Sequence, residues 1–138
     1  MMVEFYDRQE LSNPLNGTQI TVGTGLRRIV ESLRNRRPFF CELLGNNGFK
    51  LLVGIGKNVG CVQHSSSDGE PPYLMAVEEG FEFSTVDTVD FLIGSELTPV
   101  PRRYCKSMES VKQIALYFLE TGLRCPNVAW EQIGATKR

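Results

Sequence analysis

The sequence contains no lysine or arginine between Lys57 and Arg102, although the whole chain of 138 residues has 15 such residues. The net charge of the chain is only −1, so its negative charge is concentrated in this acidic segment. A local field of this kind attracts basic partners and repels nucleic acid, so we expect no nucleic-acid partner. The segment contains eight carboxylates: Asp68, Glu70, Glu78, Glu79, Glu82, Asp87, Asp90 and Glu96.

The sequence also lacks an uninterrupted apolar run of the ~18 residues that a transmembrane helix requires. Its opening residues, MMVEFYDRQE, do not have the basic-then-apolar order of a secretory signal. We therefore expect a cytoplasmic protein without a membrane partner. The length predicts a single domain over residues 1–138.

Cysteines at the short spacing of a zinc site are absent. Cys41, Cys61, Cys105 and Cys125 are separated by 20, 44 and 20 residues, and His64 is the only histidine. A structural zinc site needs closely spaced Cys or His ligands in pairs. We expect free thiols, no metal and no cofactor.

Two segments have the periodicity of helices. The first, over residues 25–35, follows a candidate N-cap at Thr24 and stops before Pro38. The second begins after a candidate N-cap at Ser107 and ends at Gly122. Apolar residues recur at helical spacing in both: Leu26, Ile29, Val30 and Leu33, then Val111, Ile114, Ala115, Phe118 and Leu119.

Between these helices the apolar period changes to two, which is typical of strands. Asn47-Gly48 separates two apolar runs and predicts a hairpin. We expect an α+β fold in which an antiparallel meandering sheet of about four to six strands carries both helices on one face. Residues 3–6 are expected to form a short opening strand, whereas residues 12–23 and 95–106 are expected to be loops or connections.

His64 invites a catalytic or metal-binding interpretation that its neighbours do not support. Ser65, Ser66 and Ser67 adjoin it in sequence, but nucleophilic catalysis requires a base oriented by a third group, not adjacency. His64 together with Asp68 and Glu70 would form a metal site with few ligands on a flexible Ser/Gly-rich turn. The glycines of GIGKNVG precede a strand rather than the helix that a phosphate loop needs. We expect a protein that is not an enzyme and has no small-molecule substrate.

The first helix gives the alternative: a small nucleic-acid-binding or ligand-binding regulatory protein. The helix and its end carry Arg27, Arg28, Arg34, Arg36 and Arg37. Glu31 mixes charge signs on this surface, and no aromatic side chains interleave with the arginines to stack on bases. A solvated helix face is the simpler interpretation.

The chain also resembles a known family. In order, it contains LLVGIG, CVQHSSSDGEPPYL, VDFLIGSELTPVP, SVKQIALYFLETG and NVAWEQI. Together these segments, from about residue 38 to 132, resemble the first-numbered immunity-protein family of bacterial polymorphic toxin systems.

The resemblance implies a non-enzymatic α+β protein that neutralises a cognate toxin by binding it. Partners of this family are often toxins that act on nucleic acids, particularly deaminase-like ones. The acidic segment agrees with this, because carboxylates can occupy a cleft built for phosphates. The expected partner-binding residues are Asp68, Glu70, Tyr73, Glu78, Glu79 and Glu82, with His64 and Trp130 as further members.

Overall fold

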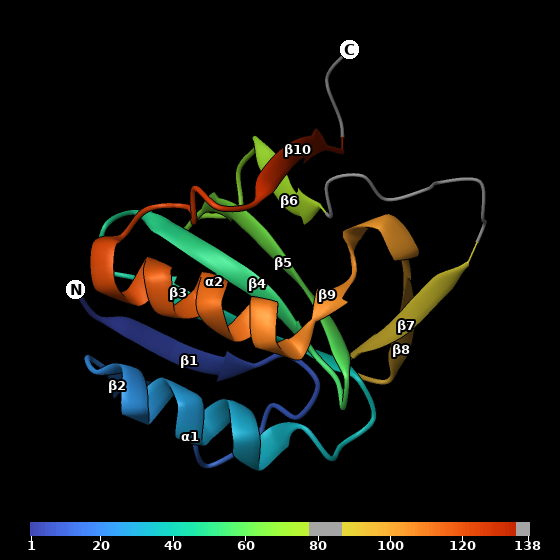
Figure 1. Cartoon of the computed structure of the whole chain (residues 1–138). Coiled ribbons are helices and arrows are strands. Elements are labelled where there is room, and N and C mark those ends of the chain that lie inside the picture. Colours follow the sequence, from blue (N-terminus) through green and yellow to red (C-terminus); the bar gives the residue numbers. More distant parts are fainter. Residues whose placement is uncertain (78–86, 135–138) are drawn as a thin grey trace.

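The structure, a computed structural model, describes residues 1–77 and 87–134 and consists of one twisted sheet with two helices (Figure 1). The described helices are α1 (Gly23–Leu33), α2 (Met108–Thr121) and a single 3-10 turn, η1 (Arg102–Tyr104). The described strands are β1 (Val3–Asp7), β2 (Thr18–Ile20), β3 (Phe39–Gly45), β4 (Phe49–Ile55), β5 (Val59–Ser66), β6 (Tyr73–Val77), β7 (Thr88–Ile93), β8 (Glu96–Pro101), β9 (Lys106–Ser107) and β10 (Ala129–Ile133).

The sheet runs in the order β10-β6-β5-β4-β3-β1-β2, so the meander expected from the sequence is its centre. Strands β3 to β6 are neighbours in chain order and pair antiparallel. The β7–β8 hairpin leaves this path, and β7 contacts β3 in parallel through Phe39 and Leu92. In Figure 1 the hairpin projects to one side of the main sheet.

Both helices cover the same face of the sheet, as expected (Figure 1). Alternate strand residues such as Phe39, Leu51 and Val62 point toward the helices and are fully buried. The apolar stripes of α1 and α2 close over them, including Leu26 and Phe118. No helix in the described ranges combines the length and the apolar character of a membrane span.

The opposite face has a second, smaller core under the β7–β8 hairpin. Phe91 and Val100 of the hairpin pack against Phe40, Cys61 and Met75 of the main sheet. Gly54 makes room for this contact, because a Cβ at that position would lie 2.8 Å from the Phe91 ring. The acidic segment therefore includes a hairpin that is anchored by apolar packing.

The expected strand count was too low, because short and proline-containing segments join the sheet. Thr18–Ile20 pairs with β1 inside the region expected to be a loop, and Ala129–Ile133 extends the sheet beyond β6. The expected connection over residues 95–106 contains β8 and β9. Pro99 and Pro101 fit within β8 because, among the described strands, it pairs only with β7.

The first helix begins earlier than expected. Val22 is its N-cap residue, no side chain caps it, and Thr24 lies within the first turn. At its start the helix packs closely on α2, since a Cβ on Gly23 would lie 3.0 Å from the Leu116 side chain. The second helix agrees with expectation, since Ser107 Oγ accepts from Ser110 N–H and Gly122 is left-handed with φ 77°.

A buried carboxylate fixes the segment that joins β1 to β2. The side chain of Asp7 is fully buried and accepts hydrogen bonds from the backbone N–H groups of Gln9 and Glu10. Arg36 pairs with it at 2.7 Å and also stacks on Phe39, 3.8 Å from the ring centroid. Burial raises the pKa of Asp7, but the hydrogen bonds outweigh it and leave the pKa below its ordinary value.

Replacing this carboxylate should destabilise the fold. We expect Asp7→Ala to lower the free energy of unfolding by about 3 kcal/mol, because it leaves the Arg36 charge uncompensated and two backbone N–H groups without their acceptor. Chemical denaturation measures the change. Glu10→Ala removes an exposed carboxylate from the same loop and should have little effect. Equal stability of both variants would contradict a structural role for Asp7.

Candidate partner-binding site

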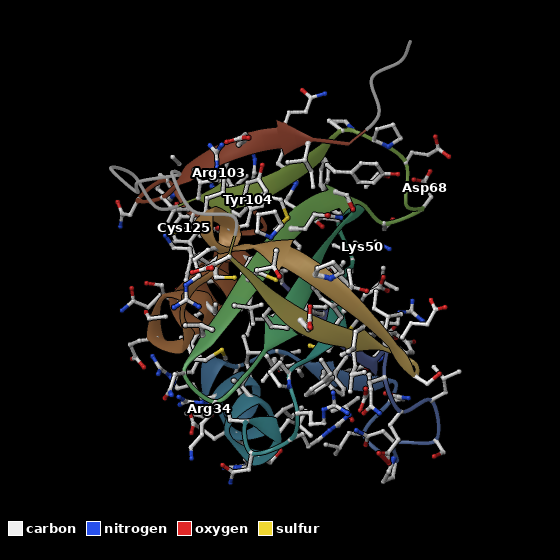
Figure 2. The ribbon with its side chains drawn as sticks, turned by 90° about the vertical axis from the view of Figure 1, so that its right-hand side faces the viewer. Arg34, Lys50, Asp68, Arg103, Tyr104 and Cys125 are labelled. Atoms are coloured by element: carbon white, nitrogen blue, oxygen red, sulfur yellow. The ribbon has the colours of Figure 1, made fainter. Side chains whose placement is uncertain are left out.

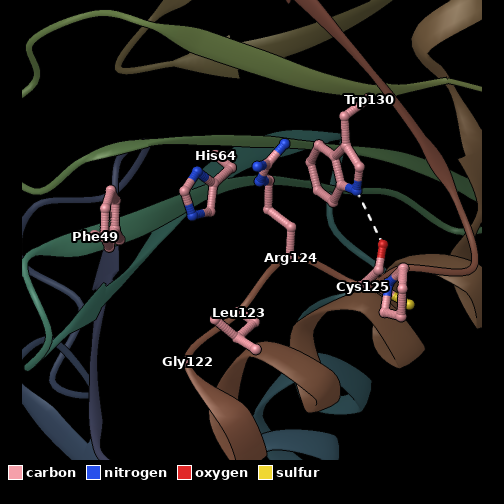
Figure 3. Close-up of a pocket in the computed structure, with 8 residues that line it drawn as sticks. Phe49, His64, Gly122, Leu123, Arg124, Cys125 and Trp130 are labelled. Carbon is pink, nitrogen blue, oxygen red and sulfur yellow. Dashed lines mark hydrogen bonds between the residues drawn. The ribbon is translucent and has the colours of Figure 1, made fainter.

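His64 and Trp130, expected as partner-binding residues, line one pocket at the end of the sheet (Figure 3). The pocket has a volume of about 410 Å³, within the range of small-ligand sites. Strands β4, β5 and β10 contribute to it, together with the chain that follows α2. Its lining residues are Phe49, His64, Gly122, Leu123, Arg124, Cys125, Pro126 and Trp130.

Strand register brings three aromatic rings together in this pocket. Leu51 of β4 pairs with His64 of β5, so Phe49, two residues earlier, lies on the same face as His64. The Phe49 and His64 rings stack at a centroid distance of 5.0 Å, and Trp130 meets His64 edge-on at 6.3 Å. The indole N–H of Trp130 donates to the Cys125 carbonyl at 3.0 Å, which holds that ring in place (Figure 3).

The end of α2 forms the floor of the pocket. The Gly122 N–H donates to the Phe118 carbonyl at 2.7 Å and terminates the helix. The side-chain amide of Asn47, in the β3–β4 turn, donates to the Gly122 carbonyl at 2.9 Å. This bond ties the helix end to the hairpin beside Phe49, and the chain then turns so that Leu123 and Arg124 reach the pocket.

His64 is neutral at pH 7. Burial lowers its pKa to about 4, and the positive charge of Arg124 contributes in the same direction. The side chain is 8% exposed, and its ring makes no hydrogen bond within the part of the chain that the structure describes. The hydroxyl of Ser65 donates to the Ser66 carbonyl and that of Ser66 donates to Asp68, so neither of these two serines is hydrogen-bonded to His64.

The turn after β5 carries the first acids of the acidic segment and adjoins the pocket. Ser67 N–H donates to the Gly48 carbonyl at 2.9 Å, which places this turn next to Phe49. Asp68, labelled in Figure 2, and Glu70 are both exposed. Hydrogen bonds from the Ser66 hydroxyl and the Glu70 N–H hold the pKa of Asp68 below its ordinary value. Tyr73 is half-buried and donates to the Gly69 carbonyl at 2.6 Å, so its hydroxyl shapes the turn.

The other expected acids divide into two groups. Asp90 and Glu96 of the β7–β8 hairpin are exposed, as is Asp87. Glu78, Glu79 and Glu82 lie outside the described residues, so their roles stay predictions from the sequence. Among the described residues, no ion pair involves Asp68, Glu70, Asp90 or Glu96.

Carboxylates outside the acidic segment have a different role, because several of them hold the fold together. Glu42 pairs with Arg8 and Lys50, and Glu31 of α1 pairs with Lys112 of α2 at 2.6 Å. Glu131 of β10 pairs with Arg103. The structure therefore separates carboxylates that are paired internally from carboxylates that face outward.

The arginines of the first helix are not a continuous basic surface. Arg36 pairs with buried Asp7, and Arg34 contacts Glu31 and donates to the Lys57 carbonyl. Arg27, Arg28 and Arg37 remain exposed. In Figure 2, Arg34 and Asp68 lie at opposite ends of the view, so this helix is remote from the acidic turn.

Of the eight lining residues, only His64 and Trp130 were expected from the sequence, and Phe49 and Arg124 are the most important of those that were not. The alternation of residues 49–55 indicated that Phe49 shares a face with buried residues, but its exposed fraction of 43% and its contact with His64 depend on the β4–β5 register. Arg124 gave no signal, because its position depends on the left-handed turn at Gly122 and on the path of the chain toward β10.

Comparison with known proteins does not identify the chain. No family model matches the sequence, and no curated protein matches it. The resemblance to immunity proteins thus rests on the sequence features described above and stays a prediction. The geometry of the pocket and of the unpaired acids carries the functional argument.

The neutral state of His64 predicts a pH dependence of stability. Its pKa is about 4 in the folded protein against an ordinary value of 6.5, so the unfolded chain takes up the proton first as the pH falls. We expect the contribution of His64 to the free energy of unfolding to be complete above pH 6.5 and to be lost progressively as the pH falls toward 4, by up to about 3 kcal/mol.

Urea denaturation across this pH range tests the prediction. His64→Gln keeps the carboxylates whose pKa values are lowered, such as Asp7 and Glu42, and should show a flatter profile between pH 6.5 and 4.5. The same slope in both proteins would show that His64 is not the titrating group.

Proposed function

We propose that this protein is an immunity protein, which binds a cognate bacterial toxin and blocks it. One observation carries the proposal: the described acids of the segment without Lys or Arg are all exposed, and Asp68, Glu70, Asp90 and Glu96 form no ion pair with a described residue. Keeping such charges unpaired adds self-repulsion to the folded state and contributes nothing to the core. Binding to a basic partner would compensate these charges.

The chemistry of the partner follows from the charge. A toxin that acts on DNA or RNA, such as a deaminase-like one, has a basic cleft because phosphates supply much of its substrate's affinity. Carboxylates on a rigid turn can occupy such a cleft in place of phosphates. Complementary charge also accelerates encounter between the two proteins.

The rigidity of the acidic turn supports this use. Asp68 accepts from Ser66 and Glu70, and Tyr73 donates to Gly69, so the carboxylates project from a turn that is already organised. A preorganised surface loses less conformational entropy on binding. The adjacent pocket offers aromatic rings, the residue type that most often anchors interfaces.

Charge reversal tests the proposed interface. We expect Asp68→Lys with Glu70→Lys to reduce the association rate with the toxin encoded beside this protein by at least about tenfold at low salt, because steering depends on these charges. Stopped-flow kinetics over a range of salt concentrations measures the effect, and the association rate of the unmodified protein should fall as salt rises.

A matched control has the same change in net charge elsewhere. Glu10→Lys with Glu120→Lys alters two exposed acids outside the acidic segment, one before β2 and one on α2. This control should associate at nearly the original rate. Equal slowing of association by both double variants, or an association rate that does not change with salt concentration, would argue against the acidic segment as the docking surface.

A further inference from the structure

The aromatic pocket contains one uncompensated positive charge. Among the described residues that line it, Arg124 is the only charged one, and its guanidinium extends toward His64 and Trp130 (Figure 3). No carboxylate of the described residues forms an ion pair with Arg124. A guanidinium presents planar pairs of N–H donors that match the two oxygens of one carboxylate.

A second polar group in the pocket also lacks a partner. His64 is only 8% exposed, and its ring makes no hydrogen bond to a described residue. A neutral imidazole has one N–H donor and one acceptor, and the ring nitrogens of His64 are not among the fully buried atoms, so they can reach a ligand in the pocket. The donor of His64 and the donors of Arg124 are available at the same place.

The remaining walls are apolar. Phe49 stacks on one side of His64, and Trp130 stands edge-on at another, with the Trp130 N–H already occupied by Cys125. The volume of about 410 Å³ accommodates a short apolar stem as well as the charged group. The pocket therefore fits a ligand that is anionic at one end and apolar at the other.

We propose that this pocket binds a carboxylate carried on an apolar stem, with Arg124 pairing with the carboxylate and His64 donating a further hydrogen bond to it. A phosphate is a poorer fit, because its higher charge calls for more than the single cation that lines the pocket. In the complex with a toxin, which rests on the function proposed above, the carboxylate belongs to an acidic side chain of the partner.

An acid from the partner would set the orientation of the complex. The acidic turn attracts any basic surface of a partner. The pocket, in contrast, binds one carboxylate of the partner at one defined position. The two sites have opposite signs and adjoin through the contact between Ser67 and Gly48. Opposite charges side by side fix the register of an interface and exclude partners with uniform charge.

Benzoate is a suitable probe, because it joins a carboxylate to an apolar ring, and benzamide is its uncharged counterpart. Trp130 is the only tryptophan and His64 the only histidine, so indole fluorescence and the imidazole NMR signals both report on the pocket. We expect saturable benzoate binding to the full chain, weaker binding of inorganic phosphate and none of benzamide. Bound benzoate should also raise the pKa of His64, since a nearby anion favours the imidazolium.

Two arginine variants identify the charge that is responsible. Arg124→Gln should weaken benzoate binding by about tenfold, the effect of losing a charge-assisted hydrogen-bonded pair. Arg27→Gln, an exposed position on α1, should leave it unchanged. Arg124 is itself exposed, so its replacement should leave the fold intact, which circular dichroism checks.

The inference is overturned if benzamide binds as tightly as benzoate, if phosphate binds more tightly, or if Arg124→Gln binds benzoate unchanged. A separate experiment uses the toxin. Arg124→Gln should weaken the complex with the toxin, and excess benzoate should compete with the toxin for binding. If benzoate fails while charge reversal at Asp68 and Glu70 still slows association, only this inference falls. If benzoate binds as expected and no toxin does, only the proposed function falls.

Discussion

The register between β4 and β5 determines which side chains this protein buries and which it presents. Leu51 pairs with His64 and Val53 with Val62, and all four face the helices. A shift of one residue would move His64 to the opposite face and bring Gln63 under α2. The strands approach closely at Gly60, where a Cβ would lie 2.1 Å from the Gly54 carbonyl oxygen, so this position requires glycine.

Charged residues serve two separate purposes in this fold. Asp7, Glu31, Glu42 and Glu131 are bound to arginine or lysine, and they connect segments that are distant in sequence. The described acids of the acidic segment lie on turns and on the β7–β8 hairpin, and they face solvent. Apolar packing of Phe91 and Val100 holds that hairpin, whereas Asp90 and Glu96 form no ion pair with a described residue. This division permits the acidic surface to change without loss of the core.

The elements whose signals are local could be predicted from the sequence. The central meander, the Asn47-Gly48 turn, the capping Ser107 and the helix stop at Gly122 were all correct, because each depends on a few neighbouring residues. The short strands β2, β9 and β10 were not foreseen, since their pairing depends on partners far along the chain. The site divides in the same way. Exposure of Asp68 and Glu70 followed from turn chemistry, whereas the meeting of Phe49, His64, Arg124 and Trp130 required the complete sheet.

Strand β10 supplies Trp130 and pairs with β6, so one wall of the pocket comes from the last strand that the structure describes. During synthesis this segment leaves the ribosome after all the other strands of the sheet. Until it docks, β6 has a bare edge and His64 lacks its tryptophan neighbour. A nascent chain can therefore fold its centre early, yet it completes the pocket only when translation has passed Ile133.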